Sequence, residues 1–308
     1  MINKIKITIG IPAYNEEANI QNMIKSLLKQ KGASFTLEKI VVVLDGCTDN
    51  TLKIAQELAS KNKIVKVLSD GKRCGKATRL NQIYKLNKSQ LVGTFDADIL
   101  LERDCELELM VKEFLRSKKV NVVAARQYPA PADKIMGRFS NASFMMLQIA
   151  SSMWRKGNNI HSLQGSASMV RGSFARSLHF PTDTISDQGF LYMSAIKNGK
   201  AGFRYSKNTR IIFRSPETFT DWRKLGARTM IYDKENVAKN FGERALIQYK
   251  MPKKYIYKAI LTVFIRDPIG TIGSILMNIY IRKFPYLFKK RNSGIWEIIV
   301  SSKASIKV

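Results

Sequence analysis

Two carboxylates one residue apart, Asp96 and Asp98, directly follow the mostly apolar run 91–95. Such a run predicts a buried strand, and a strand that ends in Asp-x-Asp brings both acids to the carboxyl edge of a sheet. Open α/β sheets bind their ligands at that edge. Carboxylate oxygens there suit Mg²⁺ or Mn²⁺, which bridge to the phosphates of a diphosphate substrate. The pair is a modest signal alone and gains specificity from the segments before it.

The first hundred residues alternate predicted strands with predicted helices. The strands are expected at 5–11, 39–44, 64–68 and 91–95, and the helices at 15–30, 48–60 and 75–86. This alternation predicts an α/β fold with a mostly parallel sheet flanked by helices, and with loops that converge on one ligand. Asn15 is expected to cap the first helix, with Glu16 and Glu17 in its first turn.

The pattern continues to about residue 215 and then changes. Helices are expected at 104–117, 132–154 and 187–197, and strands at 120–125, 166–170 and 204–213. From residue 216 the chain is helical in pattern and very basic. We therefore expect a catalytic domain at 1–215 and a basic amphipathic helical extension at 216–308.

Four segments, 9–17, 42–51, 75–81 and 95–98, together resemble the family 2 glycosyltransferases of GT-A fold. The resemblance covers about residues 5–215. It implies an inverting, metal-dependent transfer of a hexosyl group from a nucleotide sugar, with Mg²⁺ or Mn²⁺ as cofactor.

The resemblance also implies roles at the donor site. Pro12, Tyr14 and Glu16 would line the pocket of the base and ribose, and Asp45 would accept hydrogen bonds from them. Pro12 also suits a simple turn, and Asp45 also suits a turn before Gly46. UDP is the expected nucleotide. The family usually has a second acid where this chain has Leu44, and the loss of that base contact leaves GDP open as the alternative.

Lys76 follows Gly75 at a predicted helix start, which suits contact with a diphosphate, although a solvated surface lysine has the same pattern. The resemblance places Asp98 on the metal and Asp96 on metal or ribose.

An inverting transfer needs a base for the acceptor hydroxyl. Asp187 matches the family's acidic motif in part, because Ser186 stands where an acid often stands. A helix cap is the alternative role for Asp187. Gly165 resembles the acceptor-side glycine, where the backbone approaches the sugar closely, although plain packing also needs such glycines.

The net charge is +28, from 52 Lys and Arg against 24 Asp and Glu, which favours anionic partners or simply reflects a solvated surface. Two apolar stretches, 259–265 and 269–281, are flanked by basic residues and broken by Arg266-Asp267-Pro268. They suit helices in an anionic membrane interface, or helices that only cover the catalytic domain. The processive family motif Gln-x-x-Arg-Trp is missing from 217–225, so a single transfer is expected.

We therefore expect a peripheral enzyme at the inner, cytoplasmic face of the cell membrane. Its partners would be a nucleotide-sugar donor and a glycolipid, polyprenyl-linked or surface-glycan acceptor. Three cysteines without CxxC spacing and the lack of a leader pattern fit a reduced compartment. A nucleotidyltransferase, a basic nucleic-acid-binding protein and an inactive membrane-surface protein with the same fold remain alternatives, although no specific nucleic-acid motif is present.

Overall fold

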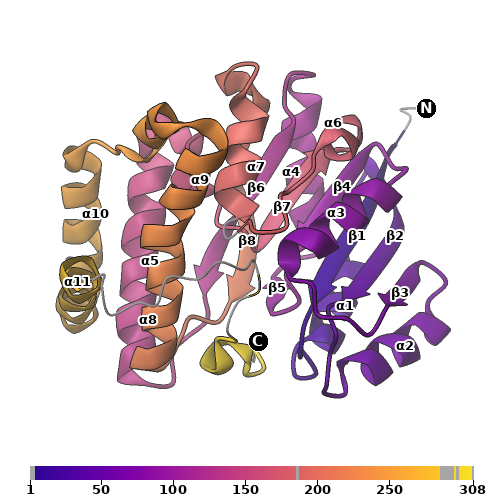
Figure 1. Cartoon of the computed structure of the whole chain (residues 1–308), viewed down its shortest axis with the longest axis horizontal. Helices are drawn as coiled ribbons and strands as arrows, with labels where there is room; N and C mark the ends of the chain where they lie inside the picture. Colours follow the sequence, from indigo (N-terminus) through magenta and orange to yellow (C-terminus); the bar gives the residue numbers. More distant parts are fainter. Residues whose placement is uncertain (1–3, 185–186, 285–294, 296–297, 307–308) are drawn as a thin grey trace.

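The computed structural model describes residues 4–184, 187–284, 295 and 298–306. Its centre is an eight-stranded sheet with the order β3-β2-β1-β4-β7-β6-β8-β5 (Figure 1). The strands are β1 (Ile5–Ala13), β2 (Phe35–Leu44), β3 (Val65–Ser69), β4 (Leu91–Phe95), β5 (Ile99–Leu101), β6 (Val122–Pro129), β7 (Ala167–Arg171) and β8 (Phe203–Phe213).

Four of the seven strand pairings are parallel: β1 with β2 and β4, β2 with β3, and β6 with β8. β7 runs antiparallel to both β4 and β6, and β5 runs antiparallel to β8. The sheet is therefore parallel in its N-terminal half and mixed beyond it. The carboxyl ends of β1, β2 and β4 lie at one edge, as the sequence predicts.

Helices cover both faces of the sheet. Residues of α1 (Ile20–Leu28), α2 (Thr51–Lys61) and α4 (Glu106–Leu115) share one buried apolar cluster with Ile7, Ile9 and Ile11 of β1. Residues of α3 (Lys76–Leu86), α6 (Gly172–Ser177) and α7 (Asp187–Ile196) share the cluster on the other face with Val43 and Val92. Alternation of side chains along the strands feeds both clusters.

The first helix departs from its prediction. It begins at Ile20, and Asn15 has φ +51° in the turn before it, so Asn15 is not its cap, and Glu16 and Glu17 lie outside it. The Asn15 side chain bonds instead to the loop after β2, because its Nδ2 donates to Thr48 Oγ1 at 3.0 Å and its Oδ1 accepts from the Thr48 amide at 2.8 Å. Its oxygen is therefore engaged away from the helix amides that a cap would have to bind. β5 and α6 have no counterpart among the predicted elements.

The C-terminal region is helical, as expected. It comprises α8 (Phe219–Ala227), a π-helical turn at Arg228–Tyr232, α9 (Asp233–Phe241), α10 (Lys253–Arg266), α11 (Pro268–Lys283) and a short 3₁₀ turn at Val300–Lys303. α10 and α11 pack against the long helix α5 (Ile135–Met153) at one side of the molecule (Figure 1). Within the described residues, every helix is too short or too polar to cross a bilayer.

Candidate active site

The loops that follow β1 and β2 are bound to each other at the carboxyl edge of the sheet. Asn15 Oδ1 accepts from the Thr48 amide at 2.8 Å, and the Glu16 amide donates to Thr51 Oγ1 at 2.7 Å. Glu17 accepts from the Asn50 amide at 3.0 Å. These bonds hold residues 13–16, which we call the donor loop, in one conformation despite the positive φ at Asn15. Such a strained turn persists where its surroundings fix it.

Pro12 lies in β1 rather than in the expected turn, and Tyr14 follows directly after the strand. Pro12 is the penultimate residue of β1 and pairs with Val43 of β2. The Tyr14 ring is half-buried, and the Arg73 guanidinium lies 3.5 Å from its centre. A flat aromatic surface beside a cation is the kind of surface on which a nucleobase and its phosphates find partners.

Asp45 serves the loop before α3. Its carboxylate accepts from the amides of Cys74 at 2.8 Å and Gly75 at 3.0 Å, and from Arg79 Nε at 2.8 Å. Arg79 also pairs with Asp70 at 2.8 Å. The Gly75 amide also donates to Oδ1 at 3.2 Å, so Oδ1 accepts three bonds and Oδ2 accepts one, and Oδ2 keeps capacity for a further donor. Asp45 therefore has a structural role beside the ligand role expected of it.

Lys76 joins the two acids that the sequence separates by about ninety residues. Its ammonium lies 2.7 Å from Asp96 Oδ1 and 3.1 Å from Asp187 Oδ2, and it donates to the Gly165 carbonyl at 3.2 Å. Gly165 has φ +79°, and a Cβ built on it would lie 3.0 Å from Gln188 Oε1. Four predicted site residues from four different segments thus converge on one point.

The electrostatics of this point follow from burial and charge. Burial opposes the charge of Lys76, but Asp187 and Asp96 outweigh it and raise the pKa of Lys76. Burial raises the pKa of the Asp96 carboxyl. The charges of Asp98 and Asp187 raise it further, whereas the charge of Lys76 lowers it. Lys76 is therefore charged, and it holds together two carboxylates that repel each other.

A second group of charges lies beside the first. Burial raises the pKa of Glu16, the charge of Asp98 adds to this, and Lys303 opposes it. Lys303 pairs with Glu16 and also donates to the Tyr14 carbonyl at 2.6 Å. Sequence reasoning missed Lys303, because no motif surrounds it and it lies 289 residues from Tyr14.

The acids fit a divalent cation that a diphosphate helps to bind. Within the described part of the chain, there is no cluster of three or more His, Cys, Asp and Glu side chains placed to hold a metal alone. Asp96 and Asp98 nevertheless lie in one electrostatic group with Glu16 and Asp187, and two lysines face these four carboxylates. Two negative charges stay unbalanced when all four are ionised. Mg²⁺ commonly binds through one or two carboxylates plus substrate phosphates.

Comparison with known proteins gives a family and a fold. The sequence model described as "Glycosyl transferase family 2" matches residues 8–178. The hyaluronan synthase of Pasteurella multocida is 34% identical over 123 residues, which are 40% of this chain and 12% of that protein. The poly-beta-1,6-N-acetyl-D-glucosamine synthase of Staphylococcus aureus strain COL is 26% identical over 141 residues, 46% of this chain and 33% of that protein. The chain thus spans a third or less of these relatives.

Solved structures with the same fold extend the match along the chain. A mannosyltransferase from Pyrobaculum calidifontis, in complex with GDP-Man and Mn²⁺, has a TM-score of 0.57 at 17% identity, covering 92% of this chain and 76% of that one. The glucosyl-3-phosphoglycerate synthase of Mycobacterium tuberculosis, with Mn²⁺ and UDP-Glc, has a TM-score of 0.55 at 17% identity, covering 77% and 79%. The predicted GT-A type of α/β fold is confirmed.

Proposed function

The chain belongs to glycosyl transferase family 2, and from this premise we propose that it moves a hexosyl group from a nucleotide sugar to an acceptor hydroxyl with inversion. The observation that carries the proposal is the convergence of Asp96, Lys76, Asp187 and Gly165 at the carboxyl end of β4. Each comes from a different segment, and each has the chemistry that such a transfer needs.

We propose one role for each of these residues. Asp98 and Asp96 are the proposed ligands of Mg²⁺ or Mn²⁺, which when bound stabilises negative charge on the leaving diphosphate. Lys76 lies 2.7 Å from Asp96, so its ammonium is proposed to contact the same diphosphate. Asp187 is the proposed base for the acceptor hydroxyl, and its carboxylate lies 3.1 Å from the Lys76 ammonium, beside the proposed diphosphate site.

The donor is proposed to be UDP-linked and to lie on the donor loop, against Pro12, Tyr14, Glu16 and Asp45. The M. tuberculosis synthase, which has the same fold, was solved with UDP-Glc and Mn²⁺. The P. calidifontis enzyme was solved with GDP-Man, so GDP is the competing choice. Both neighbours were solved with Mn²⁺, which supports a divalent cation here.

A thermal-shift panel tests this proposal. UDP, GDP, CDP and dTDP are each added with Mn²⁺, Mg²⁺ or EDTA, because a ligand that binds only the folded state raises the unfolding midpoint. We expect UDP with a divalent cation to raise the midpoint, and EDTA or Asp98→Ala to remove the rise. A folded wild-type sample that responds to none of the four nucleotides would contradict the proposal.

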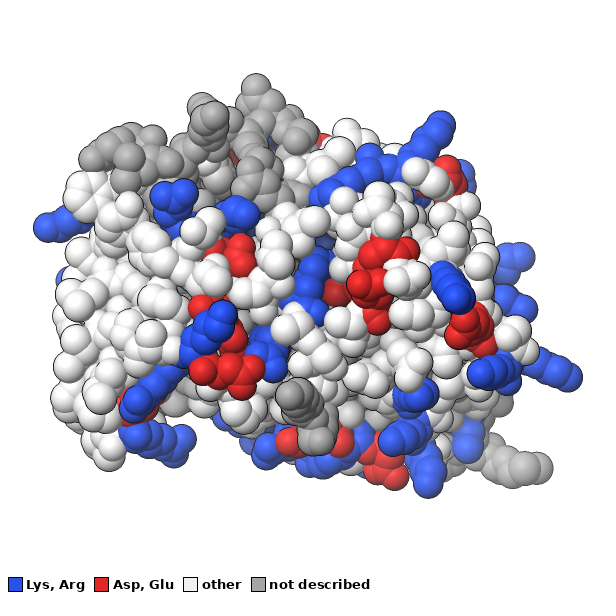
Figure 2. Space-filling view, turned by 90° about the horizontal axis from the view of Figure 1, so that it is seen from below, with Lys and Arg blue, Asp and Glu red and all other residues white. Residues whose placement is uncertain are grey.

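The acceptor is proposed to be a glycolipid, polyprenyl-linked sugar or growing glycan at the cytoplasmic membrane face. α10 and α11 support this, because each presents a row of large apolar side chains to solvent. The rows are Tyr257, Leu261, Phe264 and Ile265 on α10, and Ile269, Ile272, Leu276 and Ile279 on α11. Figure 2 shows a broad surface without charges on this side of the molecule, while charges of both signs crowd the rest of the view.

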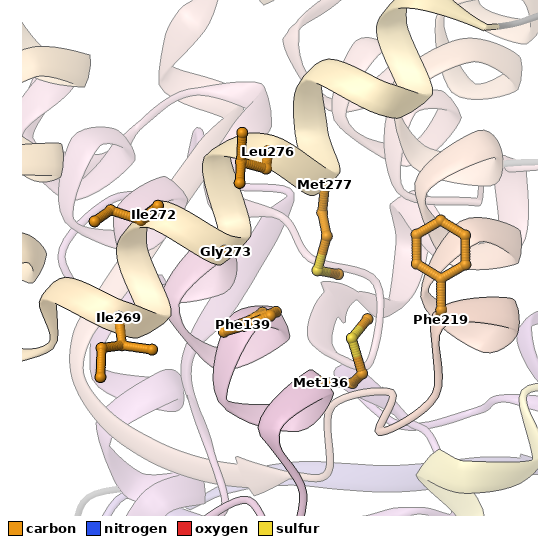
Figure 3. A pocket seen from close by; sticks show the side chains of 8 residues that line it. All are labelled: Met136, Phe139, Phe219, Ile269, Ile272, Gly273, Leu276 and Met277. Carbon is orange, nitrogen blue, oxygen red and sulfur yellow. The ribbon is translucent and has the colours of Figure 1, made fainter.

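Basic residues flank the two rows. Lys253, Lys254, Lys258, Arg266, Arg282 and Lys283 are all exposed. An apolar row with cationic flanks matches the interface of an anionic bilayer, where apolar side chains enter the acyl boundary and cations meet the headgroups. Between α11, α5 and α8 lies an apolar pocket of about 450 Å³, lined by Phe139, Leu276 and their neighbours, which offers room for part of a lipid chain (Figure 3).

A further inference from the structure

The segment 298–306, which we call the strap, contacts both α8 and the donor loop. Ser301 is its first anchor: its amide and hydroxyl both donate to Asp221 Oδ2, at 2.8 and 2.7 Å, and its hydroxyl accepts from the Glu217 amide at 3.0 Å. Asp221 and Glu217 are both buried. Charge-assisted bonds to a buried carboxylate are among the stronger hydrogen bonds in proteins.

The far end of the strap is also fixed. Ile306 is 4% exposed and packs with Leu100 and Ala130 of the catalytic region. Arg214 donates to the Ser305 carbonyl at 3.3 Å. The strap is therefore bound on both sides of Lys303, and this fixes where its side chain points.

All three N–H donors of the Lys303 ammonium contact the donor loop. It donates to the carbonyls of Tyr14 at 2.6 Å and Asn15 at 3.1 Å, and it pairs with Glu16. The Lys303 carbonyl in turn accepts from Asn19 Nδ2 at 2.8 Å. An ammonium has three donors and no acceptor, so this contact set satisfies it completely.

The bonded carbonyls belong to the turn that needs outside support. Asn15 has φ +51°, and neither Tyr14 nor Asn15 lies in a helix or strand. Lys303 therefore ties together three consecutive residues of a loop that regular secondary structure does not hold. The side chain is 21% exposed, and its ammonium lies 6.0 Å from the centre of the Tyr14 ring.

We propose that the strap completes the donor site and that Lys303 is a positioning residue, which holds the donor loop in the shape that receives the nucleoside diphosphate of the sugar donor. This inference rests on the proposed function. It makes nucleotide affinity depend on a residue outside the part of the chain that matches the family, since that match ends at residue 178.

The test compares Lys303→Met with the wild type. Dissociation constants of UDP and of GDP, each with Mn²⁺, are measured by calorimetry, and donor KM and kcat are measured separately. We expect Lys303→Met to weaken nucleotide binding about tenfold to a hundredfold, the range typical of charge-assisted hydrogen bonds. Donor KM is expected to rise by a similar factor. The value of kcat at saturating donor is expected to change less than about threefold, because Lys303 contributes to donor binding and not to the chemical step.

Three further variants make the test specific. Lys303→Arg keeps the charge and the donors, and is expected to recover most of the affinity. Ser301→Ala removes the hydroxyl bonds of the strap to Asp221 and Glu217 and is expected to weaken binding in the same direction but less. Lys207→Met removes one exposed lysine of β8 and serves as the control for net charge, with no change expected.

The outcomes separate the two proposals. A wild type that binds neither nucleotide contradicts the proposed function, and the inference built on it falls too. A wild type that binds, together with Lys303→Met that binds equally well, contradicts the inference alone. Tighter binding by Lys303→Met also contradicts it, because the strap would then obstruct the site. If Lys303→Met does not fold, unchanged affinity in Ser301→Ala overturns the inference.

Discussion

At the scale of residues, the position of Lys76 decides how the site is balanced. It contacts Asp96 and Asp187 at once, so two proposed roles, metal binding and proton transfer, share one counter-ion. Removing either acid leaves Lys76 paired with the other acid alone. Substitutions of the two acids are nevertheless expected to have different effects on activity, since Asp96 would act on the donor and Asp187 on the acceptor.

Asp187→Asn is expected to lower turnover by about 10²- to 10⁴-fold, the usual range for loss of a general base, because an amide cannot take the hydroxyl proton. Nucleotide affinity with Mn²⁺ is expected to stay within about threefold, because Asp98 and Asp96 remain. Hydrolysis of the donor sugar, in which water replaces the acceptor, measures turnover without a known acceptor. Asp183→Asn, an exposed carboxylate that pairs with Lys239, is the matched control. Normal turnover in Asp187→Asn would refute its assignment as the base.

The prediction for Arg79 concerns the stability of the fold. Its side chain is 2% exposed and pairs with Asp45 and Asp70. Arg79→Met leaves the buried Asp45 carboxylate without its cation, and such losses cost about 3 kcal/mol or more. We expect urea titration to show that decrease in the free energy of unfolding. Arg116→Met, which breaks a pair with Glu113 in which the Arg116 side chain is 69% exposed, is expected to cost less than about 1 kcal/mol. Equal effects of the two changes would argue against a buried ion pair at Arg79.

At the scale of elements, strands could be predicted better than loops. The run 91–95 is β4 as predicted, and β8 begins one residue before its predicted start. Their apolar composition is a local signal that burial then satisfies. The turn at Asn15 could not be predicted, because its conformation depends on Thr48 in another loop. β5 has only three residues and exists because β8 offers it an edge.

The candidate site divides in the same way. Asp96 and Asp98 are recognisable because they follow a strand, and Asp187 because it opens a helix. Ser186, beside Asp187, lies outside the described residues. The sequence gives no local sign that Lys76 bridges Asp96 and Asp187, since that contact joins three segments only after the sheet has formed.

The apolar rows of α10 and α11 carry a prediction about membranes. Leu261→Glu with Leu276→Glu places charges at two positions that are 59% and 62% exposed, so folding is expected to be kept. In flotation with vesicles that contain anionic lipid, we expect the wild type to float and the double variant to stay with the soluble fraction. Nucleotide-dependent thermal shifts of the double variant should match the wild type. Equal flotation of both proteins would show that these rows do not bind the bilayer.

At the scale of the whole molecule, the proposed division at residue 215 does not separate the contacts that complete the site. The strap belongs to the C-terminal region by sequence, yet Lys303 contacts Tyr14 and Glu16 near the start of the chain. α10 and α11 likewise cover α5, which precedes the division. Predicting this arrangement from sequence fails because contacts over such separations leave no periodic or motif signal in a single chain.

Two truncated chains separate the effect of losing the strap from the effect of losing all residues after 215. A chain ending at residue 295 loses the strap but keeps α10 and α11 on α5. We expect its thermal unfolding midpoint to lie within a few degrees, roughly, of that of the full chain, because only the contacts of the strap are lost. Its shift with UDP and Mn²⁺ is expected to be largely lost, because the donor loop has no Lys303. A chain ending at residue 215 also exposes the α5 residues Ala142 and Met146, now buried with Val263 of α10, and is expected to aggregate or to unfold at lower temperature. If the 215-residue chain gave the full nucleotide shift, residues 1–215 would bind the donor without help. The strap and the helices of 216–308 would then serve only attachment and solubility.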